Sequence, residues 1–236
     1  MGPRQALIGG EMDYERYAIY FTPAGAFGQA GASWLGWDIV QGRQVTPPPI
    51  DAIPLADFTD TPRKYGFHAT IKPPFALAAG RDPQGLQAAF EAMCKELEPI
   101  VLAGLNFTWM GGFLALTIEG DTELLNACAA HVVRTLDPFR APLSPSDLAR
   151  RQRPSLTDAQ QRNLRDWGYP HVMDSYRFHM TLTGRVPRRQ REAVGAVASD
   201  HLGPHIPRPF LLGDLSLVGQ GVDGMFHQIH RARLLG

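Results

Sequence analysis

The chain has 236 residues and a mass of 26.0 kDa, enough for one large domain or two closely packed lobes. Its 23 lysines and arginines balance its 23 aspartates and glutamates, which argues against binding to long duplex nucleic acid. No apolar run approaches the roughly 18–20 residues of a membrane-spanning helix, and residues 1–12 lack a long apolar stretch, so we expect no secretory signal there. We therefore expect a soluble, cytoplasmic protein without a membrane partner.

The first half of the chain mixes strand and helix signals, with proline closing several segments. Its predicted elements are a strand at 16–22, a helix at 27–37, a Pro-rich loop at 45–62, a strand at 64–75, a helix opened by Asp82 and Pro83, strands at 105–110 and 113–119, and a helix opened by Asp121. Gly111 and Gly112 predict a tight hairpin between the two later strands.

The second half begins with a polar, Arg-rich connection at 140–172, in which Thr157 and Gln160 predict a capping box at the start of a short helix. After it come a predicted strand at 174–184, a helix at 188–201, and a strand pair at 211–218 and 225–234. The arginines of the connection are expected to form a solvated surface, with a lid that recruits an anionic substrate as the alternative. They are Arg150, Arg151, Arg153, Arg162 and Arg165.

A seven-residue pattern occurs twice in the chain. YGFHATI at 65–71 aligns with YRFHMTL at 176–182, at an offset of 111 residues. In both places a strand precedes a helix and then a two-strand hairpin. The match in sequence and in context predicts an internal duplication.

Strand alternation assigns opposite faces to the residues of each copy. The apolar face, which we expect to join the core, carries Phe67, Ala69, Ile71, Phe178, Met180 and Leu182. The polar face carries His68, Thr70 and Lys72 in the first copy, and Arg177, His179 and Thr181 in the second. Tyr65 and Tyr176 fall on the core face by strict counting, although an irregular pleat near Gly66 would turn Tyr65 toward the polar face.

The polar faces suit phosphoryl chemistry. Imidazoles exchange protons near neutral pH, threonine hydroxyls donate to phosphate oxygens, and Lys72 or Arg177 can offset phosphate charge. Displacement at phosphorus runs in line, so one histidine can serve as the base and the other as the acid on the opposite side. Because Arg177 is closer in sequence to its histidine than Lys72 is, we assign His179 as the base and His68 as the acid.

The paired HxT motifs, His68-Ala69-Thr70 and His179-Met180-Thr181, resemble the two-histidine (2H) phosphoesterase superfamily, which includes 2′-5′ RNA ligase-like proteins and cyclic phosphodiesterases. RYAIYF, SWLG, RKYGFHATIKPPF, WGYP and YRFHMTLTG resemble a bacterial branch described as phosphonate-metabolism proteins. The resemblance implies catalytic roles for both histidines and both threonines. Tyr65, Lys72, Tyr176 and Arg177 are the candidate substrate ligands.

The expected fold is α+β, a single bilobal domain over 1–236, with a first lobe at about 15–120 and a second at about 121–236. Each lobe should hold an antiparallel sheet with flanking helices, and the two motif strands should line a central cleft. The alternative architecture is a ferredoxin-like domain with an appended α+β region.

The expected function is metal-independent hydrolysis of a small cyclic phosphodiester, with a small phosphorylated molecule as partner and no cofactor. Processing of RNA 3′ ends that carry a 2′,3′-cyclic phosphate, and a non-enzymatic phosphate- or nucleotide-binding module, are the alternatives. We expect no metal at His227 and His230, because an HxxH spacing on a strand points the two imidazoles to opposite faces. Cys94 and Cys128 indicate no disulfide framework, and the sequence contains no P-loop or GxSxG motif.

Overall fold

The computed structural model describes residues 14–236 and has the predicted α+β architecture. The expectation that residues 1–12 carry no secretory signal therefore lies outside the described residues. A seven-stranded antiparallel sheet forms its centre. In spatial order the strands are β11 (Phe226–Arg233), β10 (Asp214–Gln220), β1 (Arg16–Phe21), β4 (Ala69–Phe75), β8 (His179–Thr181), β7 (Phe113–Glu119) and β6 (Gly104–Met110). Two small sheets pair β2 (Trp37–Asp38) with β3 (Arg43–Gln44), and β5 (Ile100–Leu102) with β9 (Phe210–Leu212).

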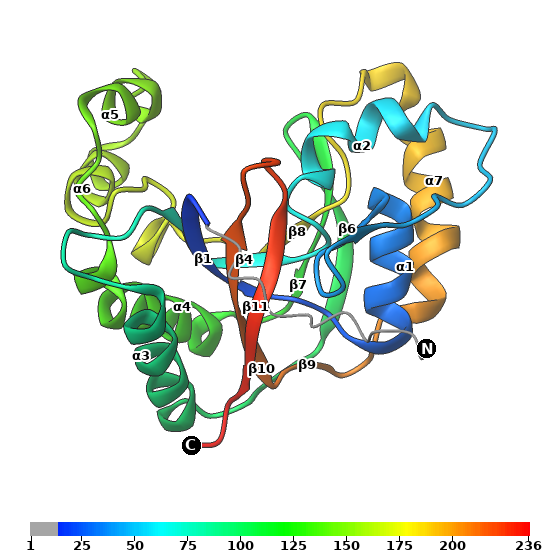
Figure 1. Ribbon diagram of the computed structural model, residues 1–236. Helices are drawn as coiled ribbons and strands as arrows, with labels where there is room; N and C mark the ends of the chain where they lie inside the picture. Colours follow the sequence, from blue (N-terminus) through cyan, green and yellow to red (C-terminus); the bar gives the residue numbers. More distant parts are fainter. Residues whose placement is uncertain (1–13) are drawn as a thin grey trace, which may run out of the picture.

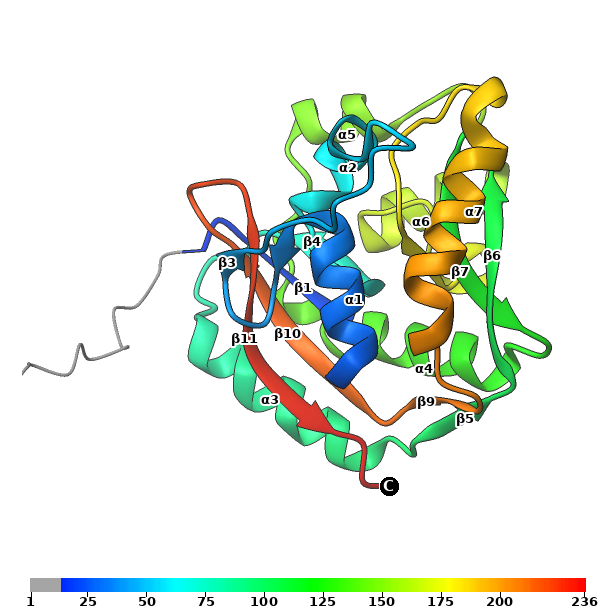
Figure 2. The same cartoon turned by 90° about the vertical axis from the view of Figure 1, so that its right-hand side faces the viewer.

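The seven α-helices of the described chain form two groups on either side of the strands (Figure 1). One group contains α1 (Gly25–Leu35), α2 (Leu55–Arg63) and α7 (Arg191–Leu202). The other contains α3 (Pro83–Glu96), α4 (Glu123–Thr135), α5 (Pro145–Arg151) and α6 (Asp158–Trp167). In Figure 2, α1 and α7 lie side by side in front of the strands, where Ser33 hydrogen-bonds to His201. Within residues 14–236, no helix has the length and apolar character needed to cross a bilayer.

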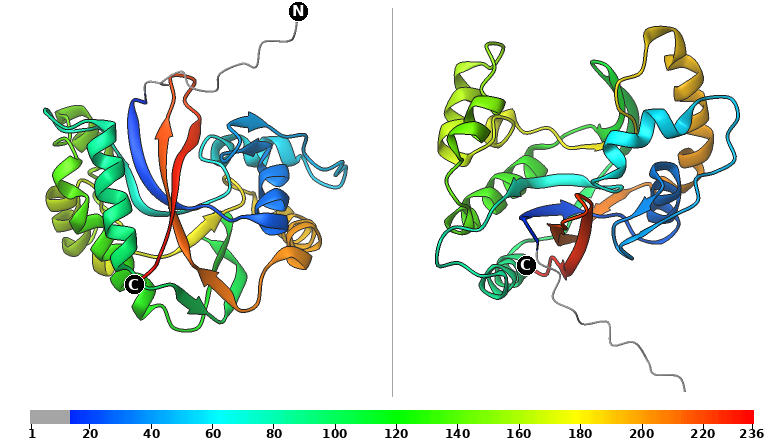
Figure 3. Two further views of the ribbon diagram at one scale, coloured as in Figure 1. Left: turned by 60° about the horizontal axis from the view of Figure 1, so that its bottom comes forward. Right: turned by 45° about the horizontal axis from the view of Figure 1, so that its top comes forward.

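Each hairpin lies next to the motif strand of the other half of the chain. Hairpin β6–β7 follows β4 in sequence, yet β7 pairs with β8. Hairpin β10–β11 follows β8, yet β10 pairs with β1, which in turn pairs with β4 (Figure 3). The expectation of a separate sheet in each lobe is therefore wrong, because the strands of the two halves interleave in one continuous sheet.

Several helix and turn signals act as predicted. The Asp82 side chain accepts a hydrogen bond from the Gly85 amide at the start of α3. Thr157 and Gln160 form the predicted capping box at α6. Gly111 has a φ of 62°, the left-handed conformation that a tight hairpin turn requires. Local backbone chemistry therefore sets these element boundaries.

The Pro-rich segment contains a helix, α2, where a loop was expected. Pro62 lies in its last turn and lacks the amide that would bond the carbonyl of Phe58. That carbonyl accepts instead from the amide of Gly184, in the segment that follows the second motif strand, at 2.6 Å. The buried side chains of Leu55 and Phe58 anchor the helix in the core. The high proline content of the segment had led to the prediction of a loop. Helix α5, within 140–172, was also not predicted.

The motif strands are shorter than predicted. The first begins at Ala69 because Gly66 has a φ of 70°, which interrupts extended structure. The second covers only His179–Thr181, since a 3₁₀ turn occupies Met173–Ser175. The core-face assignment survives these changes, because the six apolar residues of the two motifs all belong to the main core cluster.

Candidate functional site

The two HxT motifs lie side by side at the centre of the sheet, on β4 and at β8 (Figure 1). Ala69 and Met180, the central residues of the motifs, are direct partners in the antiparallel pairing. Both are fully buried, so the flanking histidines and threonines share the opposite face. The register therefore relates the two motifs by an approximate twofold axis between Ala69 and Met180.

His68 is held on both ring nitrogens. Its Nδ1 lies 2.9 Å from the Gly66 carbonyl oxygen, and its Nε2 lies 3.0 Å from the Thr70 hydroxyl. Nδ1 must donate to the carbonyl, so in the neutral ring Nε2 accepts from Thr70. The ring also stacks on Tyr20 at 3.8 Å between centroids. Burial, opposed by the Gly66 bond and assisted by the charge of His179, lowers the pKa of His68 to about 4.

His179 repeats part of this arrangement. Its Nδ1 donates to the Arg177 carbonyl at 2.8 Å, as His68 does to the carbonyl two residues earlier in its own motif. The same tautomer is thereby set in both copies, with Nε2 directed away from the chain that precedes it. The His179 ring is half-exposed and lies 6.1 Å from the Phe113 ring. The two histidines thus share one orientation and are both partly buried, and the His68 ring is covered by Tyr20.

A cleft of about 660 Å³ opens at the motif faces. Its charged, titratable and hydroxyl lining residues are Thr61, Tyr65, His68, Thr181, Thr183, Arg185, Arg188 and Arg191. Thr183 is buried, and its hydroxyl accepts from the Leu114 amide, so it braces the cleft floor. Tyr65 reaches the cleft because of the positive φ at Gly66, and its ring stacks on Phe226 at 5.3 Å. Of the four predicted catalytic residues, His68 and Thr181 line this cleft, while Thr70 contacts it through its bond to His68 and His179 lies one strand position from Met180, opposite Thr117.

Lys72 does not lie with them. A register irregularity in the pairing of β4 with β1 breaks the strict alternation and turns Lys72 toward α4. Only 2% of its surface is exposed, and Nζ donates to the Val133 carbonyl at 3.1 Å and to Asp137 at 3.4 Å. Burial, opposed by Asp137, lowers the pKa of Lys72 to about 8. Its assignment to the histidine face is wrong.

Tyr176 and Arg177 also differ from expectation. The Tyr176 ring is buried in the core, and its hydroxyl donates to the Thr70 carbonyl at 3.1 Å, so it positions β4. Arg177 lies before the first residue of β8, where alternation does not yet apply. Its exposed side chain lines a neighbouring hollow with Trp109 and Thr117, and only its carbonyl contacts His179.

Other residues near the site carry no motif and were not singled out. Tyr20 covers His68, and its fully buried hydroxyl has no hydrogen-bond partner among the described residues. Burial and the neighbouring hydroxyl of Tyr65 raise the pKa of Tyr20, while Arg16 opposes them. Burial and the charge of His179 lower the pKa of His171. The WGYP segment supplies Tyr169 beside them, and only the family resemblance pointed to that segment.

The HxxH pair separates as predicted. His227 packs against Trp37 and lies 3.5 Å from Asp223, whereas His230 lies 3.1 Å from Glu91 of α3. In the part of the chain that the structure describes, no three or more His, Cys, Asp or Glu side chains gather in a metal-binding arrangement.

Comparison with known proteins adds a family and two curated relatives. The model of a family described as Protein of unknown function (DUF1045) matches residues 70–227. A protein of Janthinobacterium sp. (strain Marseille) named Ribose 1,5-bisphosphate phosphokinase PhnN is 40% identical over 184 residues, covering 76% of this chain and 41% of that protein. A protein of the same name from Laribacter hongkongensis (strain HLHK9) is 32% identical over 197 residues, covering 82% of this chain and 46% of that protein.

The chain therefore spans less than half the length of these relatives. Among solved structures, one titled "Crystal structure of phosphoesterase" aligns with a TM-score of 0.44 and 11% identity, over 95% of this chain and 100% of that one. A score of this size is too low to establish a shared fold.

Proposed function

The chain belongs to the family described as Protein of unknown function (DUF1045), and we propose that it is a metal-independent phosphodiesterase that opens a small cyclic phosphodiester. One observation carries the proposal. The direct pairing of Ala69 with Met180 brings two HxT motifs to one face, with matching Nδ1 hydrogen bonds on both histidines. Two imidazoles in fixed tautomers across a shared face suit in-line displacement at phosphorus.

In the proposed reaction, His68 is the base. Its burial keeps the ring neutral at physiological pH, which reverses the assignment made from sequence spacing. Nε2 of His68 takes a proton from water as the water oxygen bonds to phosphorus. The bond from phosphorus to the departing ring oxygen breaks, and protonated His179 gives that oxygen its Nε2 proton. The product is a phosphomonoester with a free hydroxyl.

The threonines bind the non-bridging oxygens in this proposal. The Thr70 hydroxyl bonds Nε2 of His68 in the free protein, so it must turn toward phosphate when water takes its place at the ring. The Thr181 hydroxyl lines the cleft and is available to a second oxygen. Hydroxyl donors aimed at oxygens that gain charge lower the barrier, because their orientation is set beforehand.

The names of the curated relatives suggest a substrate. They are named for phosphorylation of ribose 1,5-bisphosphate, a kinase reaction. This chain has no P-loop and covers under half of them, so we assign the named kinase reaction to the part of the relatives outside the match. Hydrolysis of a cyclic phosphodiester joining O1 and O2 of ribose 5-phosphate, with cleavage at O2, would produce ribose 1,5-bisphosphate. We therefore propose such a ribosyl cyclic phosphate as the substrate, which agrees with a role in phosphonate metabolism.

The test is a screen of cyclic phosphodiesters in excess EDTA, followed by ³¹P NMR. It should include ribose 5-phosphate 1,2-cyclic phosphate, nucleoside 2′,3′-cyclic phosphates and RNA with cyclic 3′ ends. We expect the ribosyl compound to be opened to a monoester, and His68→Ala to abolish the reaction. Hydrolysis confined to RNA ends would replace this function with RNA end processing. Tight binding without turnover would indicate a binding module.

A further inference from the structure

A second, more enclosed cavity lies between the end of β4, the start of β1 and helix α5. Its volume is about 80 Å³. We call it the basic cavity, and its charged and hydroxyl lining residues are Arg16, Lys72, Arg140, Asp147, Arg151 and Tyr169. It unites Lys72, which the cleft does not use, with two arginines of the Arg-rich connection. Figure 1 shows α5 and α6 standing on this side of the strands.

Positive charge exceeds negative charge around this cavity. Lys72 and Arg140 share one carboxylate, that of Asp137, at 3.4 Å and 2.7 Å. Within residues 14–236, neither Arg16 nor Arg151 forms a salt bridge. Each donates a hydrogen bond of 2.7 Å to a neutral oxygen, Arg16 to the Gln220 side-chain amide and Arg151 to the Gly168 carbonyl. The carboxylate of Asp147 already bonds Ser144 and Arg150. Two half-buried guanidinium groups without carboxylate partners favour an anion.

Tyr20 and Tyr169 connect the basic cavity to His68. The Tyr20 ring stacks on His68, and its buried hydroxyl lies within electrostatic reach of Arg16 and Tyr169. Tyr169 lines the cavity, with the Arg151 guanidinium 5.5 Å from its ring centroid. Among the described residues the Tyr20 hydroxyl has no hydrogen-bond partner, and a buried hydroxyl left in this state is costly.

We propose that the basic cavity binds a phosphomonoester group on the substrate, and so selects cyclic phosphodiesters that carry a second phosphate. The inference rests on the proposed hydrolysis in the cleft and adds the recognition of a remote anion. Arg16 and Arg151 supply the guanidinium donors, which match phosphate oxygens in geometry and charge. Of the three arginines of the cleft, Arg185 and Arg188 are exposed, where water weakens their attraction for phosphate. The half-buried Arg191 is held against the Trp109 ring and donates to the Val186 carbonyl at 3.3 Å.

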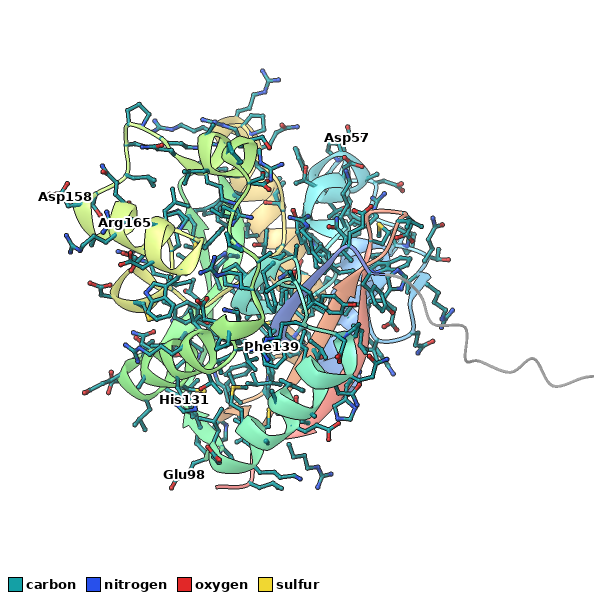
Figure 4. All side chains as sticks on the ribbon, turned by 60° about the vertical axis from the view of Figure 1, so that its left-hand side comes forward. Asp57, Glu98, His131, Phe139, Asp158 and Arg165 are labelled. Carbon is teal, nitrogen blue, oxygen red and sulfur yellow. The ribbon has the colours of Figure 1, made fainter. Side chains whose placement is uncertain are left out.

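The binding test uses ribose 5-phosphate and inorganic phosphate as probes in isothermal titration calorimetry. We expect Arg16→Gln and Arg151→Gln each to weaken ribose 5-phosphate binding at least about tenfold, because each removes charged donors. Arg165→Gln is the matched control, since Arg165 of α6 is 69% exposed, pairs with Asp166 and does not line the basic cavity (Figure 4). Its affinity should stay within about twofold of the wild-type value. Thermal melting checks that each variant is folded. Arg16 and Arg151 lie on separate elements, so if one variant does not fold, the other still tests the anion site.

The kinetic test compares kcat/KM for ribose 5-phosphate 1,2-cyclic phosphate with that for ribose 1,2-cyclic phosphate. The wild type should prefer the first by about a hundredfold, and Arg151→Gln should reduce this preference to less than about tenfold, through KM. Equal affinity in the wild type and both arginine variants, or a loss that occurs in Arg188→Gln instead, would overturn the inference while leaving hydrolysis intact. If no cyclic substrate is hydrolysed but ribose 5-phosphate binding still depends on Arg16 and Arg151, the proposed reaction fails and the anion site stands.

Discussion

Ala69 and Met180 face each other across β4 and β8, and this single pairing determines where both histidines lie. A slip of one residue would move His68 or His179 to the core face, because side chains alternate along a strand. Ala69 and Met180 have no exposed surface, so the core beneath them fixes the register. The motifs therefore act as a pair only because the apolar residues between each histidine and threonine are packed.

The two histidines should differ in their response to leaving-group quality. His68→Ala removes the proposed base, so hydrolysis should fall by about two to four orders of magnitude with every substrate. His179→Ala removes the acid, and a nitrophenyl phosphodiester should retain most of its rate because nitrophenolate leaves without a proton. Comparison of kcat/KM for the nitrophenyl and cyclic substrates in both variants checks this. The opposite ranking would restore the sequence-based assignment.

His68 should make the protein sensitive to mild acid. Its pKa falls from 6.5 to about 4 in the folded protein, so its neutral form stabilises the fold above pH 6.5 and that contribution is lost as pH falls through 4. The shift corresponds to about 3 kcal/mol. We expect the unfolding free energy, measured with urea, to decline between pH 6.5 and 4 in the wild type and to decline less in His68→Gln. Parallel curves for the two proteins would contradict this.

Gly66 should be intolerant of a side chain. Its φ of 70° disfavours L-residues, and a Cβ here would lie 2.7 Å from the Cβ of Ile39. Gly66→Ala should lower the unfolding free energy by about 2–3 kcal/mol and reduce activity, since the Gly66 carbonyl holds Nδ1 of His68. Gly80→Ala is the control, because Gly80 has a φ of 76° but open space around it. It should cost about 1 kcal/mol and leave kcat/KM unchanged. Equal losses in both variants would refute the steric argument.

Much of this site could be predicted from the sequence, because it depends on local alternation and on a repeated pattern. The polar face of His68 and Thr70 and the core face of Ala69 follow from period-two geometry alone. Lys72 could not be placed, since the irregular register between β4 and β1 depends on a strand about fifty residues earlier in the chain. The interleaving of the two hairpins could not be predicted either, because a sequence repeat indicates which elements form but not which strands pair with one another. The role of Tyr20 could not be predicted, because its strand has the apolar sequence of an ordinary core strand.

The Tyr20→Phe variant tests whether the Tyr20 hydroxyl serves stability or substrate binding. The Tyr20 hydroxyl is buried without a partner among the described residues, so removing it should leave the unfolding free energy unchanged or raise it by about 1 kcal/mol. If the hydroxyl completes a bond to substrate, kcat/KM should fall about tenfold. Tyr176→Phe is the matched control and should lose about 1 kcal/mol of stability, because its hydroxyl donates to Thr70. A Tyr20→Phe variant with full activity would remove Tyr20 from the substrate site.

The buried Lys72 amine should lower the unfolding free energy of the protein at neutral pH. Its pKa falls from 10.5 to about 8 on folding, mainly through burial, so the neutral amine stabilises the fold above pH 10.5 and that contribution is lost as pH falls through 8. At pH 7 the charged amine therefore costs about 3 kcal/mol, while Asp137 keeps its bond to Arg140 without it. Lys72→Met should be more stable than the wild type at pH 7 in urea unfolding, and its advantage should shrink between pH 8 and 10. The same variant should bind ribose 5-phosphate more weakly if the amine serves the basic cavity. A destabilised Lys72→Met protein at pH 7 would show instead that the buried amine and its bond to Val133 hold α4 against the sheet.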